Sequence, residues 1–193
     1  MPFCASLARQ LPHLKFLLPC APINPVSYNG GMTMTSWMDL ETIPIFPTSP
    51  DNGKHIDESL TIIDGIIAAE ESGGVPAERI VVAGFSQGGA MSLATGGRAQ
   101  KKLAGVCVLS GWALPKQNVG TIAATCANKD TPFLICHGEA DRVVMFECGP
   151  NVKQVLDGAG CSDVTIHTYP GVAHSSCNEE EAHVLEFLQR VVP

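Results

Sequence analysis

Residues 84–89 read Gly84-Phe85-Ser86-Gln87-Gly88-Gly89 and contain the pattern G-x-S-x-G. An apolar, β-branched run over residues 79–83 precedes them, and a run of small and helix-forming residues over 90–94 follows. Strand, sharp turn and helix in this order are the setting of a nucleophile elbow, in which a strained turn lifts the serine hydroxyl above a sheet. The strand and the helix approach closely there, so we expect no room for side chains at positions 84 and 88. Ser86 is therefore the candidate nucleophile.

The chain on both sides of this hexapeptide alternates between strand and helix patterns. Continuous apolar runs such as residues 103–109 are typical of strands that are buried on both faces. The predicted strands cover residues 13–18, 79–83, 103–109, 133–136 and 164–169, and the predicted helices cover 3–10, 54–72, 90–94, 147–158 and 177–191. Ser176 and Glu179 have the spacing of a capping box at the start of the last helix. The alternation predicts an α/β fold with a mostly parallel sheet and helices on both faces, in a single domain over residues 1–193.

Two segments lack a sustained hydrophobic period. Residues 19–53 are rich in Pro, Gly, Asn, Ser and Met, and a structureless excursion of this length is usually a lid or a binding loop. Residues 111–131 form a second irregular segment. Trp37 in the first segment and Trp112 in the second are the large apolar residues that could line a substrate site. The alternative is that they only pack these loops against the domain.

The charge balance excludes one class of partner. The chain has 193 residues with 12 Lys and Arg against 19 Asp and Glu, a formal net charge of −7, and its basic residues are scattered. We therefore expect no binding to nucleic acid. No apolar run has the length of a membrane span, and the N-terminus lacks the charged and apolar regions of a secretion signal.

Eight cysteines are scattered without C-x-x-C spacing. We interpret them as reduced thiols, which favours a cytoplasmic protein over a disulfide framework. Cys136 with His137, and His174 with Cys177, are the pairs that could suggest a metal site. Neighbouring residues of a strand face opposite sides of the sheet, so we expect no metal ligation by the first pair and no metal centre in the chain.

A serine nucleophile needs a base to take its proton and an acid to orient the base. In an elbow of this type the chain order is serine, acid, histidine. His174 lies in the loop after the last predicted strand, where ligands bind in such sheets, whereas His167 lies within a strand and His183 within a helix. Glu139 and Asp141 both lie in the loop after the strand at 133–136, and either carboxylate fits the role of the acid.

The chain resembles the acyl-protein thioesterases, in the phospholipase and carboxylesterase group of α/β-hydrolases. The matching stretches are Pro19-Cys20-Ala21-Pro22, Ser36-Trp37-Met38-Asp39, residues 79–90, Leu103-Ala104-Gly105-Val106, His137-Gly138 with Asp141, and Tyr169-Pro170-Gly171 with His174-Ser175-Ser176-Cys177. The resemblance implies Ser86 as nucleophile, Asp141 as the acid, His174 as the base and the Gln87 N–H as an oxyanion donor. It also implies hydrolysis of long-chain acyl thioesters on protein cysteines or of lysophospholipid esters, transient membrane contact, and no cofactor.

One family feature is missing from the sequence. Family members usually begin with strands that end in His-Gly-Leu-Gly-Asp, a loop whose backbone supplies the second oxyanion donor. The only His-Gly here is His137-Gly138, so we expect a hydrolase fold that is incomplete at its N-terminus. Gly30-Gly31 is the alternative source of N–H groups. Two interpretations follow: a serine hydrolase with reduced activity, or a catalytically impaired relative that binds acyl chains without turning them over.

Overall fold

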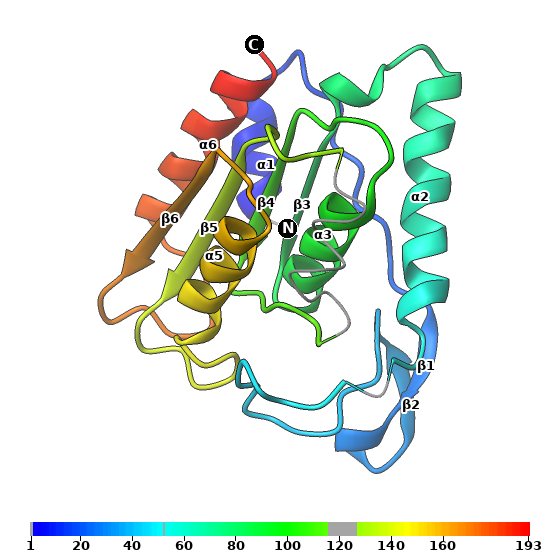
Figure 1. Ribbon diagram of the computed structural model, residues 1–193, viewed down its shortest axis with the longest axis vertical. Coiled ribbons are helices and arrows are strands. Elements are labelled where there is room, and N and C mark those ends of the chain that lie inside the picture. Colours follow the sequence, from blue (N-terminus) through cyan, green and yellow to red (C-terminus); the bar gives the residue numbers. More distant parts are fainter. Residues whose placement is uncertain (1, 52, 116–126) are drawn as a thin grey trace.

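Four runs of apolar residues form a parallel β-sheet in the structure, a computed structural model that describes residues 2–51, 53–115 and 127–193. The strands are β3 (Val81–Phe85), β4 (Gly105–Leu109), β5 (Phe133–Gly138) and β6 (Val164–Tyr169). Each pairs in parallel with the next, in the spatial order β3-β4-β5-β6 (Figure 1). Every residue of β4 and β5 is buried, as their apolar runs predicted.

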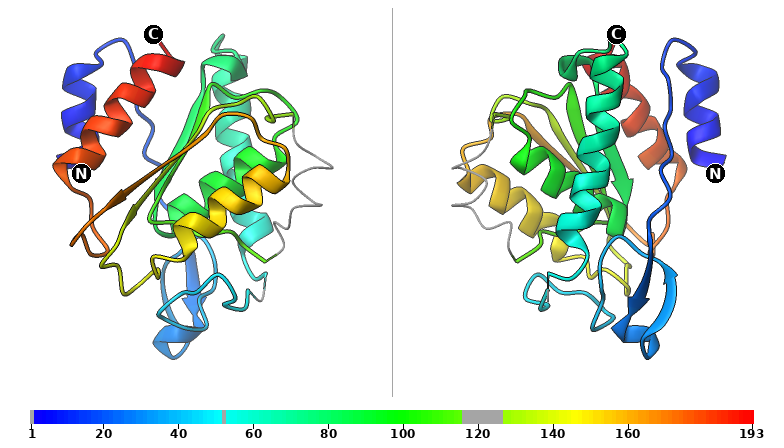
Figure 2. Two further views of the ribbon diagram at one scale, coloured as in Figure 1. Left: turned by 60° about the vertical axis from the view of Figure 1, so that its left-hand side comes forward. Right: turned by 90° about the vertical axis from the view of Figure 1, so that its right-hand side faces the viewer.

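Helices cover both faces of this sheet (Figure 2). Helices α3 (Gln87–Arg98) and α5 (Cys148–Gly158) lie on one face, and α1 (Pro2–Gln10) and α6 (Asn178–Val191) lie on the other. The alternation of strand side chains explains this, because Val106 packs into the core under α3 and α5 while its neighbour Cys107 packs under α1 and α6. Helix α2 (Ile56–Ser72) packs against α3. The predicted α/β fold is confirmed.

The helix at the C-terminal end of the chain begins differently from its prediction. Cys177 occupies the N-cap position of α6 with an extended backbone, and no side chain caps the helix. The capping box expected from Ser176 and Glu179 is therefore wrong. Acidic residues 179–181 in the first turn still complement the helix dipole. None of the described helices is long and apolar enough to cross a membrane.

Residues 13–18 do not form the strand that their apolar run predicted. They run as a loop in which Leu17 is 44% exposed and Leu18 is 58% exposed. A cleft of about 1020 Å³ is lined on one side by this loop and on the other by β3. A strand exists only through hydrogen bonds to a neighbour, and within the described chain β3 pairs with β4 alone. The apolar run therefore predicted a strand for which residues 2–51, 53–115 and 127–193 supply no partner.

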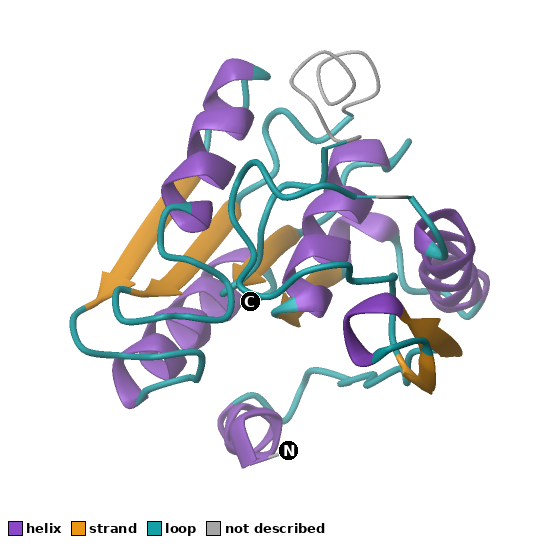
Figure 3. Cartoon of the chain, turned by 90° about the horizontal axis from the view of Figure 1, so that it is seen from below, coloured by secondary structure: helices purple, strands orange, loops and turns teal. Residues whose placement is uncertain are grey.

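Residues 19–53 contain regular structure that the sequence did not predict. Strands β1 (Ile23–Val26) and β2 (Met32–Thr35) form an antiparallel hairpin, joined by the short 3-10 helix η1 (Ser27–Asn29). Gly30 and Gly31 complete the turn with φ angles of +65° and +79°, which other residues rarely adopt. In Figure 3 the hairpin lies apart from the main sheet. A second 3-10 helix, η2 (Ala77–Arg79), leads into β3.

The second irregular segment, residues 111–131, lies only partly within the described residues. Trp112 is buried and packs in the core cluster around Met91 of α3 and Ile56 of α2. Residues 116–126 lie outside the described residues. Beyond them, the buried Asn128 accepts a hydrogen bond from the Leu103 N–H at 2.7 Å and so ties the segment to the start of β4.

Candidate active site

Ser86 lies in a sharp turn between the end of β3 and the start of α3. Its backbone has φ 57° and ψ −119°, a conformation that is strained for a residue with a side chain. A Cβ atom on Gly84 would lie 2.2 Å from the carbonyl carbon of Gly88, so position 84 has no room for one. A Cβ on Gly88 would meet nothing within 4 Å. The close approach predicted for both glycines is therefore confirmed at Gly84 and wrong at Gly88.

His174 reaches Ser86 from the loop that follows β6. Its Nε2 atom lies 2.9 Å from the Ser86 hydroxyl, and its Nδ1 atom lies 2.7 Å from an oxygen of Asp141. The Phe85 ring packs against the imidazole with a centroid separation of 4.8 Å. The three side chains come from loops at the carboxyl ends of β3, β5 and β6, so the parallel sheet brings them together although 88 residues separate Ser86 from His174.

The Asp141 carboxylate is buried and held by the backbone. One oxygen accepts hydrogen bonds from the N–H groups of Val143 and Val144 at 2.9 and 3.0 Å, which leaves the other oxygen for His174. Glu139 points elsewhere and accepts a hydrogen bond from the Thr168 hydroxyl at 2.8 Å. Of the two carboxylates that the sequence left open, Asp141 is the one that contacts His174.

A second histidine lies behind Asp141. His137 is fully buried, and its Nε2–H donates to the carbonyl oxygen of Val144 at 2.9 Å, with the Asp141 carboxylate 3.6 Å away. Burial lowers the pKa of His137, so the neutral ring is favoured. The same Val144 donates its N–H to Asp141, so His137 helps to hold the turn that carries the carboxylate. Sequence reasoning considered His137 as a possible metal ligand and as part of a stretch that resembles the family, and it did not predict this contact with the turn that carries Asp141.

The remaining histidines that were weighed as bases lie away from the serine. The rings of His167 and His183 stack on each other with centroids 3.7 Å apart, and His183 hydrogen-bonds to the Tyr169 hydroxyl at 3.0 Å. Within residues 2–51, 53–115 and 127–193 there is no group of three or more His, Cys, Asp and Glu side chains that could hold a metal ion.

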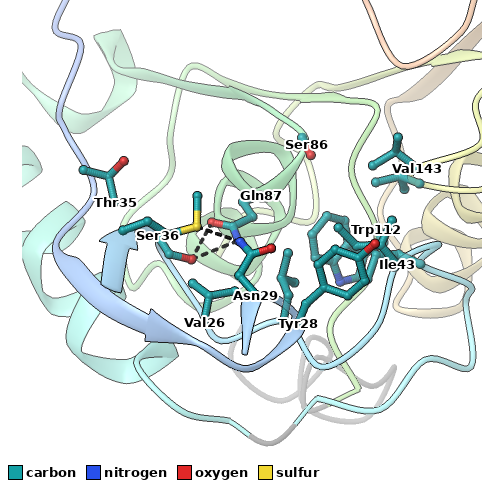
Figure 4. A pocket seen from close by; sticks show the side chains of 14 residues that line it. Val26, Tyr28, Asn29, Thr35, Ser36, Ile43, Ser86, Gln87, Trp112 and Val143 are labelled. Atoms are coloured by element: carbon teal, nitrogen blue, oxygen red, sulfur yellow. Dashed lines mark hydrogen bonds between the residues drawn. The ribbon is translucent and has the colours of Figure 1, made fainter. Parts of the chain in front are cut away.

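A pocket of about 290 Å³ opens beside Ser86 (Figure 4). Hairpin residues such as Tyr28 and Met34 line one side of it, and Val143 lines another. Trp112 also lines this pocket, whereas Trp37 lines the larger cleft along β3. Ser86 lines both spaces, so each tryptophan singled out from the sequence shares a lining with it, Trp112 in the smaller pocket and Trp37 in the larger cleft.

The backbone N–H of Gln87 is the candidate oxyanion donor. Gln87 is the first residue of α3, so its N–H has no acceptor within the helix. The alternative donors suggested by the sequence are occupied, because the N–H of Gly30 donates to Ser27 and that of Gly31 donates to Val26, at 3.0 and 2.9 Å. Gly30-Gly31 as a substitute oxyanion loop is therefore wrong.

The comparison with known families decides where this chain belongs. The model of the family described as Phospholipase/Carboxylesterase matches residues 1–192. The chain is a member of that family. The phospholipase/carboxylesterase family consists of hydrolases with the α/β-hydrolase fold, which agrees with the sheet, the elbow and the site described above.

Similar proteins in this family include two fungal enzymes. Acyl-protein thioesterase 1 of Yarrowia lipolytica is 39% identical over 186 residues, which covers 96% of this chain and 81% of the relative. Acyl-protein thioesterase 1 of Mycosarcoma maydis is 38% identical, covering 95% of this chain and 80% of the relative.

Two plant crystal structures have the same fold. SOBER1 of Arabidopsis thaliana matches with a TM-score of 0.91 and 33% identity, over 100% of this chain and 91% of its own. Acyl-protein thioesterase 2 of Zea mays matches with a TM-score of 0.77 and 26% identity, over 98% of this chain and 88% of its own.

Proposed function

We propose that this protein is a serine hydrolase that cleaves long-chain acyl thioesters on protein cysteines, with lysophospholipid and carboxylic esters as the other substrates to be tested. The observation that carries the proposal is the continuous line of hydrogen-bonding groups from Asp141 through His174 to Ser86, at 2.7 and 2.9 Å. The names of the fungal relatives, acyl-protein thioesterases, support the choice of the thioester.

The chemistry follows from this geometry in two steps. In the first, His174 Nε2 takes the proton of Ser86 as the hydroxyl oxygen attacks the acyl carbonyl. The tetrahedral intermediate collapses, the carbon–sulfur bond breaks, and the imidazolium gives its proton to the leaving thiolate. In the second step His174 takes a proton from water, the resulting hydroxide attacks the acyl-serine ester, and the fatty acid leaves as the proton returns to Ser86.

Asp141 serves this cycle without giving up its negative charge. Its buried carboxylate accepts the Nδ1–H of His174, which fixes the tautomer that presents a bare Nε2 to the serine. The same charge stabilises the imidazolium that forms when the proton moves. The two backbone N–H bonds from Val143 and Val144 hold the carboxylate in this orientation.

The oxyanion site is the part of this mechanism for which the described residues supply one candidate donor. The Gln87 N–H is the donor that we identify among the described residues, and losing one of two donors typically costs about 10²–10³ in kcat. A thiolate is a good leaving group, so a thioester suffers less from this loss than an amide. A relative that binds acyl chains without turnover is the alternative function, and the observation that favours it is that the Gln87 N–H is the one oxyanion donor identified among the described residues.

We further infer a cytoplasmic protein that meets its acylated substrates at membrane surfaces. Hairpin β1–β2, which forms one side of the pocket, carries large apolar side chains that face solvent: Ile23 is 75% exposed and Met32 is 68% exposed. Such side chains favour transient contact with lipid. The described cysteines are all free thiols, in keeping with a reducing compartment.

A pair of assays tests the function. The wild-type chain and the Ser86→Ala variant are treated with a fluorophosphonate probe and then with a palmitoyl thioester, and Ser72→Ala on α2 serves as the matched control. Labelling and turnover that Ser86→Ala abolishes and Ser72→Ala preserves would support the hydrolase. Labelling without turnover identifies the impaired relative, and turnover that persists in Ser86→Ala contradicts the assignment of the nucleophile.

A further inference from the structure

The motif Ser36-Trp37-Met38-Asp39 has no part in the proton transfers described above, yet polar contacts fix it from several directions. We call residues 36–39 the anchored loop. Asp39 accepts hydrogen bonds from the backbone and the hydroxyl of Ser27, at 2.7 and 2.8 Å, on the hairpin side. The Ser59 hydroxyl of α2 donates to the carbonyl oxygen of Trp37 at 2.6 Å. The loop therefore connects the hairpin to α2.

A third anchor comes from the residue that follows the nucleophile. The Gln87 side-chain oxygen accepts the Trp37 N–H at 3.0 Å, and its side-chain nitrogen donates to the Ser36 hydroxyl, also at 3.0 Å. The Ser36 hydroxyl donates a hydrogen bond of its own to the Met38 carbonyl oxygen at 2.6 Å. An amide at position 87 matches this arrangement because it offers an acceptor and a donor at once. Figure 4 shows the Gln87 side chain directed at Ser36, below Ser86.

The position of the hairpin depends on contacts of this kind. Strands β1 and β2 pair only with each other within the described chain and form a sheet separate from β3–β6. The hairpin nevertheless supplies Val26, Tyr28 and Met34 to the pocket beside Ser86, while the rest of the lining includes Val143 from the turn that holds Asp141. The distance between these sides decides which acyl groups fit.

We propose that the Gln87 side chain is a positioning residue that sets the selectivity of this pocket for acyl groups. Through Ser36 and the Trp37 N–H it fastens the hairpin side of the pocket to the elbow, so the pocket keeps a fixed width relative to Ser86. This role is separate from that of the Gln87 backbone N–H at the oxyanion. The inference rests on the proposed function, because selectivity has meaning only if Ser86 carries the acyl group.

The selectivity of Gln87 and Ser36 variants for long over short acyl groups tests whether the Gln87 side chain positions the pocket. Gln87→Met keeps the backbone N–H and the approximate volume but removes both side-chain hydrogen bonds, and Ser36→Ala removes the partner. The readout is the ratio of kcat/KM for octanoyl and butyryl nitrophenyl esters. We expect this ratio to fall about fivefold in Gln87→Met, which loses both hydrogen bonds, and by less in Ser36→Ala, which keeps the bond from the Trp37 N–H. The double variant should fall no further than Gln87→Met, because that substitution already removes the hydrogen bond to Ser36.

Ser59→Ala is the matched control. It removes a hydrogen bond to the same loop, from α2 instead of the elbow, so it loosens the loop while the link to Gln87 stays intact. We expect it to lower the melting temperature and to leave the octanoyl-to-butyryl ratio within twofold of wild type. An unchanged ratio in Gln87→Met, or an equal fall in Ser59→Ala, would overturn the proposal.

Hydrogen exchange separates this inference from the proposed function. The Trp37 amide, which donates to Gln87, should exchange faster in Gln87→Met than in wild type. Faster exchange in a protein that hydrolyses neither ester would refute the function while keeping the link between elbow and hairpin. Unchanged exchange at Trp37 would refute the link itself, whatever the activity.

Discussion

A Cβ atom on Gly84 would lie 2.2 Å from the carbonyl carbon of Gly88, so the backbone at the end of β3 is in direct contact with the backbone of the first turn of α3. Gly84→Ala forces these two elements apart beneath Ser86. We expect it to lower the free energy of unfolding by at least about 3 kcal/mol, since neither backbone can yield without moving its whole element. Urea denaturation followed by circular dichroism measures this.

Gly88→Ala is the matched control for that clash, because a Cβ there meets nothing within 4 Å. Alanine favours the helix over glycine by up to about 1 kcal/mol, so Gly88→Ala should equal or exceed the wild-type stability. Equal losses in the two variants would show that the close approach is not what makes position 84 intolerant.

Asp141→Asn tests the orientation of His174. Asparagine keeps an oxygen for the backbone N–H groups of Val143 and Val144 but no longer stabilises the tautomer with a bare Nε2. We expect kcat to fall by about four orders of magnitude with little change in melting temperature. Glu139→Gln, which changes the carboxylate bonded to Thr168, should retain nearly full activity. A stronger effect at Glu139 would reassign the acid.

Glu180 predicts a dependence of stability on pH. The carboxyl is 1% exposed, and burial raises its pKa from 4.5 to about 7. The folded protein therefore holds this proton between pH 4.5 and 7 while the unfolded chain releases it, and the stability that Glu180 contributes below pH 4.5 is lost as the pH rises to 7.

Glu180→Gln mimics the protonated form at every pH. We expect its stability to match wild type near pH 4 and to exceed it at pH 8 by up to roughly 3 kcal/mol. Glu186→Gln, at an exposed position of the same helix, should produce no such rise. Denaturant titrations at the two pH values measure the difference, and a constant offset between wild type and Glu180→Gln would contradict the prediction.

The pocket beside Ser86 predicts a preference for longer acyl groups. Each methylene that leaves water contributes about 0.8 kcal/mol, or about fourfold in kcat/KM, as long as the pocket accommodates it. Octanoyl esters should therefore be cleaved much faster than acetyl esters. Trp112→Ala should weaken this preference, because the buried indole lines the pocket. Equal kcat/KM values for acetyl and octanoyl esters in the wild type would exclude an apolar acyl site.

The sequence predicted those features of the fold that depend only on neighbouring residues in the chain. The runs that became β4 and β5 are buried on both faces, and their apolar character is visible without knowledge of the neighbours. Pairing is not local: residues 13–18 also form an apolar run, and they form no strand because no partner strand lies beside them in the part of the chain that the structure describes. Hairpin β1–β2 was missed because Pro25 interrupts its first strand, although Gly30-Gly31 and the alternation Met32-Thr33-Met34-Thr35 are signals of a turn and a strand.

The candidate site was predictable for a related reason. Ser86 is recognised from its immediate neighbours, and His174 follows from the rule that the carboxyl ends of parallel strands meet at one edge. The same rule leaves Glu139 and Asp141 open as the acid, and the family resemblance is what pointed to Asp141. The hydrogen bonds that link Gln87 to Ser36 and Trp37 join residues about 50 positions apart, and no local sequence pattern predicts them. The burial of Glu180 did have a signal, since it lies one turn before Val184 on the apolar face of α6.

The separate hairpin has a consequence for the evolution of such a protein. The groups proposed to perform the chemistry lie at one edge of the parallel sheet. Much of the pocket lining belongs to the two-stranded hairpin, which forms no strand pairing with that sheet among the described residues. Substitutions at Val26, Tyr28 or Met34 can reshape the acyl site at little risk to Ser86, His174 and Asp141. Selectivity for acyl groups can therefore evolve separately from the catalytic residues. The Gln87 side chain is the exception, because it links the hairpin side of the pocket to the elbow that carries Ser86.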